Sequence, residues 1–165
     1  MERVQNYFDR YPSQEAVALL LLRQGLSVKD GFAYCGDIRQ SDVAIARAAK
    51  VDRRVVRSTI MKIEETPELL ALYSKLRCML LLSDAAPQIG CTAMDIVPTD
   101  ATMPGILASI TNILYKAGLS VRQAVVSDPG VRADSHLIVV VDGTIPGDTL
   151  SAVRQARGVA SVTLQ

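Results

Sequence analysis

The stretch DVAIARAAKVDRRVVRSTIMKI, residues 42–63, decides the fold of the N-terminal half of the chain. Its apolar residues recur at helical spacing in two blocks, which a short turn around Val51 separates. The first block carries its apolar side chains on one helical face: Val43, Ala46 and Ala49, with Ile45 beside them. Small residues in this block let a second helix cross closely. The spacing predicts two short helices that pack against each other.

The second block begins with a strong helix-start signal. Asp52 is a good N-cap, and its carboxylate suits the positive end of the helix that follows. The buried stripe predicted for this helix consists of Val56, Thr59, Ile60 and Ile63. Lys50 holds a turn position where glycine is common, and it costs about 1 kcal/mol there if the turn needs a left-handed residue.

The face opposite this stripe is basic and favours duplex DNA as a partner. A guanidinium can donate two parallel hydrogen bonds to the major-groove edge of guanine, and flanking basic groups can hold phosphates. The predicted DNA-binding residues are Arg53, Arg54, Arg57, Ser58 and Lys62. The alternative is a solvated charged face, because two helices joined by a short turn are common in small helical domains.

The composition and the charge of the chain limit the classes of protein to which it can belong. The chain has 165 residues, of which 49% are hydrophobic and 21% charged, as in a globular protein. Residues 1–78 hold 13 Lys and Arg against 10 Asp and Glu, whereas residues 79–165 hold 5 against 7. A local basic patch can therefore contact phosphates although the whole chain carries a formal charge of only +1. The longest apolar run, residues 16–22, is too short to span a bilayer, and no signal peptide is evident, so a cytoplasmic location is expected.

Chemistry-bearing residues are few. Cys35, Cys78 and Cys91 form no C-x-x-C pair, and the spacing favours simple buried or half-buried thiols. His136, the single histidine, opens an apolar strand and is expected to be structural. No nucleophile, phosphate-loop or metal-site motif is present. We therefore expect no enzyme, with no catalytic residues, no metal and no cofactor.

The remaining elements of the first half form a mostly helical domain, residues 1–78. Asp30-Gly31 between apolar flanks predicts a hairpin over 28–34, in which Phe32 and Tyr34 are expected to cover the core rather than to contact DNA as a wing. Helices are predicted over 2–10, 13–24 with Ser13 as N-cap, and 67–76. Residues 79–90 are the expected connector, whose apolar run 79–82 should dock on the protein.

The second half of the chain, residues 91–165, has a different pattern of apolar residues from the first half. Strand patterns and helix signals follow in the order strand, helix, strand, strand, helix, strand. The predicted elements are a strand at 93–97, a helix at 104–117 with a buried stripe ending at Ala117, a strand at 119–126, a turn at 128–130, a strand at 136–141, a helix starting near 146 and a strand at 159–164. The predicted fold class is thus α+β, a helix-turn-helix domain followed by a ferredoxin-like βαββαβ domain.

Residues 91–165 resemble the ACT family of small-molecule sensor domains. The resemblance rests on Asp100, Pro104 and Gly105 after the first strand, and on the step GLSV at residues 118–121. It implies a site between the first loop and the start of the second strand, usually at a dimer interface, with Asp100, Thr102, Met103, Gly105, Leu119 and Ser120 as effector-binding residues. An amino-acid carboxylate could accept hydrogen bonds from the start of the helix near Gly105. Asp100 could instead be an ordinary solvated loop acid.

The two halves together resemble prokaryotic, largely archaeal, predicted regulators of amino-acid metabolism. The resemblance implies a transcriptional regulator that binds duplex DNA through residues 42–63 and an effector, expected to be an amino acid, through the ACT-like domain. The uniformly apolar strand 137–141 indicates that the second face of the sheet is covered, either by a partner subunit or by the docked connector, and a homodimer is expected. Two alternatives remain: regulation of an enzyme by protein contact, and a small enzyme on a ferredoxin-like scaffold.

Overall fold

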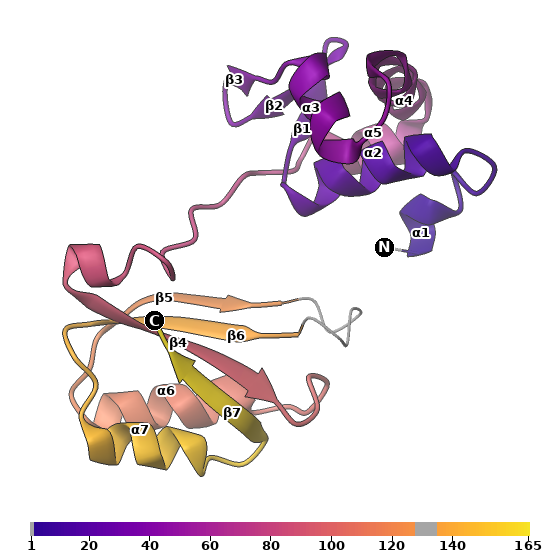
Figure 1. The fold of residues 1–165 in the computed structure, drawn as a ribbon. Helices are drawn as coiled ribbons and strands as arrows, with labels where there is room; N and C mark the ends of the chain where they lie inside the picture. The colour runs from indigo at the N-terminus through magenta and orange to yellow at the C-terminus, as the bar shows by residue number, and fades with distance from the viewer. Residues whose placement is uncertain (1, 128–134) are drawn as a thin grey trace. The chain divides into compact units, whose positions relative to one another are not determined.

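The computed structural model describes residues 2–127 and 135–165, and it divides into two compact units, Met1–Leu80 and Leu81–Gln165 (Figure 1). Each unit combines helices with one antiparallel sheet, so the predicted α+β class is confirmed. The predicted turn at 128–130 lies outside the described residues.

The first unit is mostly helical. Its helices are α1 (Glu2–Gln5), α2 (Pro12–Arg23), α3 (Asp42–Ala49), α4 (Arg53–Glu65) and α5 (Pro67–Tyr73). Its three short strands pair in the order β1 (Ser27–Lys29), β2 (Phe32–Cys35) and β3 (Ile38–Arg39).

Helix α4 lies at the centre of this unit and packs against α2, α3 and α5. Its buried residues are those predicted: Val56, Thr59, Ile60 and Ile63. The Asp52 carboxylate accepts a hydrogen bond from the Arg54 backbone N–H at 2.8 Å, which confirms the predicted N-cap. One face of α4 is therefore fixed by the core and the opposite face is left to solvent.

Helix α3 differs in detail from the prediction. Ile45 and Ala46 are buried, but Val43 is 51% exposed and Ala49 is only half-buried. The helix has only two turns, so a narrow part of it reaches the core. Lys50 ends α3 in the left-handed conformation, with φ of 56°, at a cost of about 1–2 kcal/mol for a residue with a Cβ.

The predicted hairpin is present, with Asp30 and Gly31 at positive φ in its turn. The expectation that Phe32 and Tyr34 enter the core was wrong. Side chains alternate across a strand, and Ala33 of β2 pairs with Val28 of β1, so these two fill the core while Phe32 and Tyr34 lie half-buried on the other face.

Three helix boundaries also move. Helix α1 ends at Gln5 rather than at residue 10, and α5 ends at Tyr73 rather than at residue 76. Helix α2 begins with Pro12, so Tyr11 and not Ser13 is its N-cap. Proline is favoured at the first helical position because it has no N–H to satisfy.

The second unit holds the elements β4 (Cys91–Pro98), α6 (Ile106–Lys116), β5 (Val121–Val126), β6 (Leu137–Asp142), α7 (Gly147–Arg154) and β7 (Val159–Leu164). The strands pair antiparallel in the order β5-β6-β4-β7. Helices α6 and α7 lie together on one face of this sheet (Figure 1). Side chains from the helices and from that face form the core: Met94, Ile96, Ile110, Leu114, Leu137, Val139, Val141, Val153 and Val162.

Helix α6 begins two residues later than predicted. Gly105 is its N-cap, with φ of 91°, a conformation that a residue with a Cβ adopts only under strain. Ala117, which the pattern assigned to the buried stripe, is exposed. It follows the last residue of the helix, so the helical period no longer decides which way it faces.

The segment after residue 81 covers part of the other face of the sheet. Leu82 and Ala86 pack with Cys91, Ala93 and Val140, and the Leu82 N–H donates to the Gln123 side-chain oxygen at 2.8 Å. A 3-10 helix, η1 (Pro87–Ile89), leads into β4. The expected docking of the run 79–82 holds for Leu82 alone, because Met79, Leu80 and Leu81 are exposed.

This packing accounts for the apolar strand β6. Leu137, Val139 and Val141 face the helices, while Val140 faces the covering segment.

Within the described part of the chain, no helix has the length and apolar character needed to cross a membrane.

Candidate functional sites

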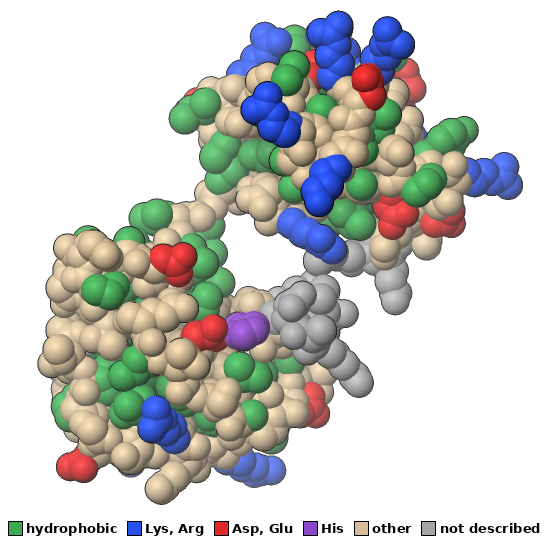
Figure 2. Space-filling model, in the orientation of Figure 1, with side chains coloured by type: hydrophobic (Ala, Val, Ile, Leu, Met, Phe, Trp, Pro, Cys, Tyr) green, Lys and Arg blue, Asp and Glu red, His purple; other side chains and the backbone are tan. Residues whose placement is uncertain are grey.

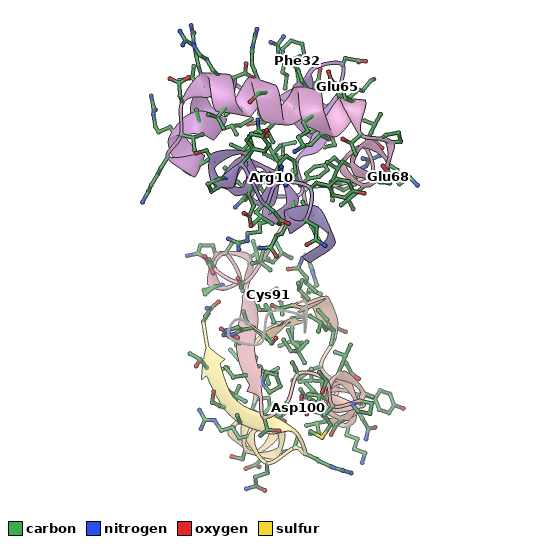
Figure 3. All side chains as sticks on the ribbon, turned by 90° about the vertical axis from the view of Figure 1, so that its right-hand side faces the viewer. Arg10, Phe32, Glu65, Glu68, Cys91 and Asp100 are labelled. Atoms are coloured by element: carbon green, nitrogen blue, oxygen red, sulfur yellow. The ribbon has the colours of Figure 1, made fainter. Side chains whose placement is uncertain are left out.

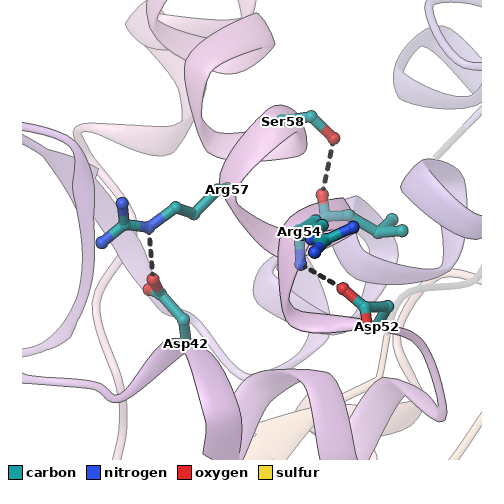
Figure 4. A network of polar contacts seen from close by, with 6 residues as sticks. Asp42, Asp52, Arg54, Arg57 and Ser58 are labelled. Atoms are coloured by element: carbon teal, nitrogen blue, oxygen red, sulfur yellow. Dashed lines mark hydrogen bonds and ion pairs between the residues drawn. The ribbon is translucent and has the colours of Figure 1, made fainter.

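The exposed side of α4 carries four polar or basic residues, here called the arginine face: Arg53, Arg54, Arg57 and Ser58. All four were predicted as site residues, and all four are exposed because they lie opposite the buried stripe. The Ser58 hydroxyl donates to the Val55 carbonyl at 3.0 Å (Figure 4). The Arg53 and Arg54 guanidinium groups make no hydrogen bond or ion pair with the described residues, so they are available to a ligand.

Arg57 is held differently. Its Nε donates to a carboxylate oxygen of Asp42 at 3.0 Å, across the junction of α3 and α4 (Figure 4). The Arg57 side chain is 71% exposed and the Asp42 side chain only 17%, so the carboxylate is the fixed partner. Because its arginine is open to solvent, the pair contributes only about 0–1 kcal/mol to stability. Its main effect is to limit the directions in which the guanidinium can point.

A hollow of about 610 Å³ lies between the end of the hairpin and these two helices. It is lined by Arg39, Gln40, Ser41, Asp42, Val43, Arg53, Arg54 and Arg57. Four arginines against one carboxylate give it a strongly positive potential, which attracts phosphates.

Arg39 is the residue of this group that sequence reasoning missed. It belongs to β3, a two-residue strand with no signal of its own, and its guanidinium lies 3.3 Å from the centre of the Phe32 ring. The outward position of Phe32 (Figure 3) thus has a structural consequence: the ring supports a cation beside the arginine face.

Lys62, the fifth predicted DNA-binding residue, is half-buried and does not share this position. Its ammonium donates to the Tyr7 carbonyl and lies 4.6 Å from the Phe8 ring centre and 5.0 Å from that of Tyr11. These contacts attach α4 to the segment between α1 and α2. We therefore leave Lys62 out of the candidate interface.

Lys and Arg side chains are frequent on the visible face of the first unit (Figure 2), which matches the excess of basic over acidic residues in 1–78. The predicted effector residues belong to the second unit.

Four of the six predicted effector residues lie on the loop between β4 and α6: Asp100, Thr102, Met103 and Gly105. Asp100 is exposed on this loop (Figure 3), and one of its carboxylate oxygens accepts from the Thr102 N–H at 2.9 Å and from the Thr102 hydroxyl at 2.7 Å. This carboxylate therefore shapes the turn. Thr102 is exposed, and Met103 is half-buried.

A small apolar cavity of about 160 Å³ opens beside this loop. Met103, Gly105, Ile106 and Leu107 line it from the loop and the start of α6, and its other lining residues are Pro98, Ala101, Val126, Ser127, Ser135, His136 and Leu137. The first N–H groups of α6 start at its rim, because a helix leaves its first four N–H groups without intrahelical partners.

The other two predicted effector residues, Leu119 and Ser120, lie elsewhere. Leu119 packs against the core, and the Ser120 carbonyl accepts from the Asp142 N–H at 3.0 Å. They follow the C-terminal end of α6, whereas Gly105 caps its N-terminal end. At 1.5 Å per residue the 11 residues of α6 separate the two ends by about 16 Å. One copy of the chain does not bring the predicted site together.

The one histidine lies against a carboxylate, with Nδ1 of His136 2.6 Å from Asp95 Oδ1. Across residues 2–127 and 135–165, the His, Cys, Asp and Glu side chains form no group of three or more that could hold a metal ion.

Comparison of the sequence with models of known protein families gives no match, and comparison with curated proteins gives none.

Proposed function

We propose that this protein is a DNA-binding regulator that responds to a small effector, and that its first unit reads duplex DNA through α4. The observation that carries the proposal is the arrangement of α4. The apolar stripe of α4 is buried in the core, and a tight turn at Lys50 joins α4 to α3, which packs against it. The opposite face of α4 carries three exposed arginines. This arrangement supports a helix-turn-helix unit, because it leaves the second helix free to enter a major groove.

The residues divide into two roles. Arg54 and Arg57 lie in the N-terminal half of α4, the part of a recognition helix that reaches base edges, and each can donate two hydrogen bonds to guanine. Arg39 and Arg53 also line the hollow and suit backbone phosphates, which fix the position of the protein without reading sequence.

Enrichment of duplex fragments from a sheared genomic pool on the immobilised full-length protein tests this function. Recurrent recovery of a small set of fragments supports sequence reading. Recovery of none, together with capture of the protein by a partner enzyme, favours the alternative in which the same surface docks on protein.

For the second unit we propose an ACT-like sensor of amino acids. The order of its elements, βαββαβ, supports this proposal, because ferredoxin-like domains have the same order, and its strands pair as β5-β6-β4-β7. An amino-acid carboxylate fits the N–H groups that open α6, and the mostly apolar cavity beside them suits an apolar side chain.

Substitution of Leu107 tests this site. Leu107 lines the cavity in the first turn of α6, so the carboxylate of Leu107→Asp would compete with the carboxylate of the effector. The substitution should not destabilise the helix, because a negative charge is favourable near its N-terminus. We expect at least a tenfold loss of affinity, measured by thermal shift for whichever of the twenty amino acids stabilises the wild type. Gly105 is a poorer choice, because any other residue is strained at its φ.

Asn112→Asp is the matched control, since Asn112 is exposed on the same helix and is not among the residues that line the cavity. It should bind like the wild type. Equal binding by both variants would place the effector site away from the start of α6.

We further propose a homodimer through the second unit. Strand β5 is at one end of the sheet, and its Val121 and Val126 side chains are 41% and 60% exposed. A second copy pairing along this edge would cover them and could bring Leu119 and Ser120 of one chain towards the α6 start of the other. Analytical ultracentrifugation at micromolar concentration should give a dimer, and Val126→Lys should give monomer; a monomeric wild type would exclude this assembly.

A further inference from the structure

Cys78 lies against the end of α2, although 53 residues separate it from Gly25 in sequence. Its thiol donates to the Gln24 carbonyl at 3.4 Å and to the Gly25 carbonyl at 3.5 Å. The contact is tight at this point, because a Cβ added at Gly25 would lie 2.4 Å from the Arg77 carbonyl oxygen. The first residues after α5 are thus fixed on residues 24–25.

Cys35 reaches the same place from the hairpin. Cys35 follows Tyr34, which pairs with Ser27 at the start of β1. Tyr34 and Gly36, the residues on either side of Cys35, line one hollow with Arg77, the residue before Cys78. The pKa of Cys35 is raised, first by hydrogen bonding with the Cys78 side chain, then by burial and by the Coulombic effect of Cys78. Both thiols are half-buried, so small oxidants can reach them.

We propose that Cys35 and Cys78 form a reversible disulfide within the first unit when the protein meets a two-electron thiol oxidant. The two thiols give up two electrons and two protons, and a sulfur–sulfur bond replaces two sulfur–hydrogen bonds. With diamide as oxidant, one thiolate first adds to the N=N bond. The second sulfur then attacks the first and the S–N bond breaks, so the oxidant leaves as a hydrazine carrying both protons.

The disulfide would close the chain from residue 35 to residue 78. That loop contains α3, α4 and the whole arginine face. Cross-linking restricts the unfolded chain, so the oxidised unit should be the more stable form. The bond would also hold residue 78 in place two residues before the boundary between the two units. Disulfides of proteins in reducing compartments are usually of this transient kind.

Thiol counting on the full chain tests the proposal. Diamide-treated wild type, denatured and titrated, should show one free thiol in place of three, and dithiothreitol should restore all three. Cys91→Ser is the matched control, because Cys91 is buried in the second unit against Ile89 and Asp142. It should fall from two free thiols to none, whereas Cys35→Ser and Cys78→Ser should each keep two.

Stability gives a second readout that does not depend on substitution. The melting temperature of the wild type should rise by several degrees on oxidation and return on reduction. The rate of oxidation should increase as pH rises towards the raised pKa of Cys35, because the thiolate is the reacting form. Three free thiols after diamide treatment, or disulfides found only between chains, would overturn the proposal.

Discussion

Replacing Gly25 with alanine is expected to lower the free energy of unfolding of the first unit by about 2–5 kcal/mol. Gly25 has a φ of 63°, where a Cβ costs about 1–2 kcal/mol. The new methyl group would also lie 2.4 Å from the Arg77 backbone oxygen, and relieving such an overlap costs about 1–3 kcal/mol more. Urea denaturation followed by tyrosine fluorescence measures the change, since four of the five tyrosines, Tyr7, Tyr11, Tyr34 and Tyr73, belong to this unit.

Gly36→Ala separates the two contributions. Gly36 has a similar φ of 58°, but a Cβ there would meet no atom within 4 Å. It should therefore lose only the backbone part, about 1–2 kcal/mol. Equal losses in the two variants would show that residues 77–78 do not pack on Gly25, and would also weaken the placement of Cys78.

Removing the Arg54 guanidinium should have the largest effect on recognition. If α4 enters the major groove, Arg54→Ala should cost about 1–3 kcal/mol on the preferred site, which is about a 5- to 150-fold loss of affinity. Binding to random duplex should change little, because base contacts supply specificity. The folded state should keep its stability, since the Asp52 cap uses the Arg54 backbone N–H and not its side chain.

Arg154→Ala is the control for charge alone. Arg154 is exposed on α7 in the second unit, so the variant loses the same charge far along the chain. Fluorescence anisotropy on the preferred and on a scrambled duplex should show wild-type affinity for this variant. A solvated charged face predicts that Arg54→Ala and Arg154→Ala behave alike.

The helix α4 could be predicted from sequence because one strong pattern determines it. Its four buried residues recur at helical spacing, and Asp52 marks its start. The turn at Asp30-Gly31 was equally readable, since few residues adopt positive φ at two successive positions. The order of elements in the second unit followed from similar signals, glycine at helix ends and apolar runs in strands.

Which hairpin side chains enter the core could not be predicted from the sequence, because the alternation of a strand shows only that neighbouring side chains face opposite ways. Size favoured Phe32 and Tyr34 for the core, but the register with Val28 puts the small Ala33 there. The same register exposes Phe32 to Arg39, so the contribution of Arg39 to the basic hollow could not be seen either.

The candidate sites show the same limit. Lys62 lies on the flank of α4 by helical period, but the chain before Pro12 folds back to it, a contact between residues 55 positions apart. Leu119 and Ser120 follow α6 in sequence, and the helix predicted over 104–117 already separates them from Gly105 within one copy of the chain. Periodicity assigns a face, whereas a site depends on which distant segment meets that face.

The salt dependence of duplex binding by the full-length protein tests the central claim most directly. Each neutralised phosphate contributes about −0.9 to the slope of log affinity against log salt. If Arg39 and Arg53 each hold one phosphate in both halves of a dimer, anisotropy titrations should give a slope of about −3.6, with an Arg39→Ala variant closer to zero by about 1.8. No binding to any enriched or random duplex at low salt, with and without amino acids, would contradict the assignment of α4 as a DNA-reading helix.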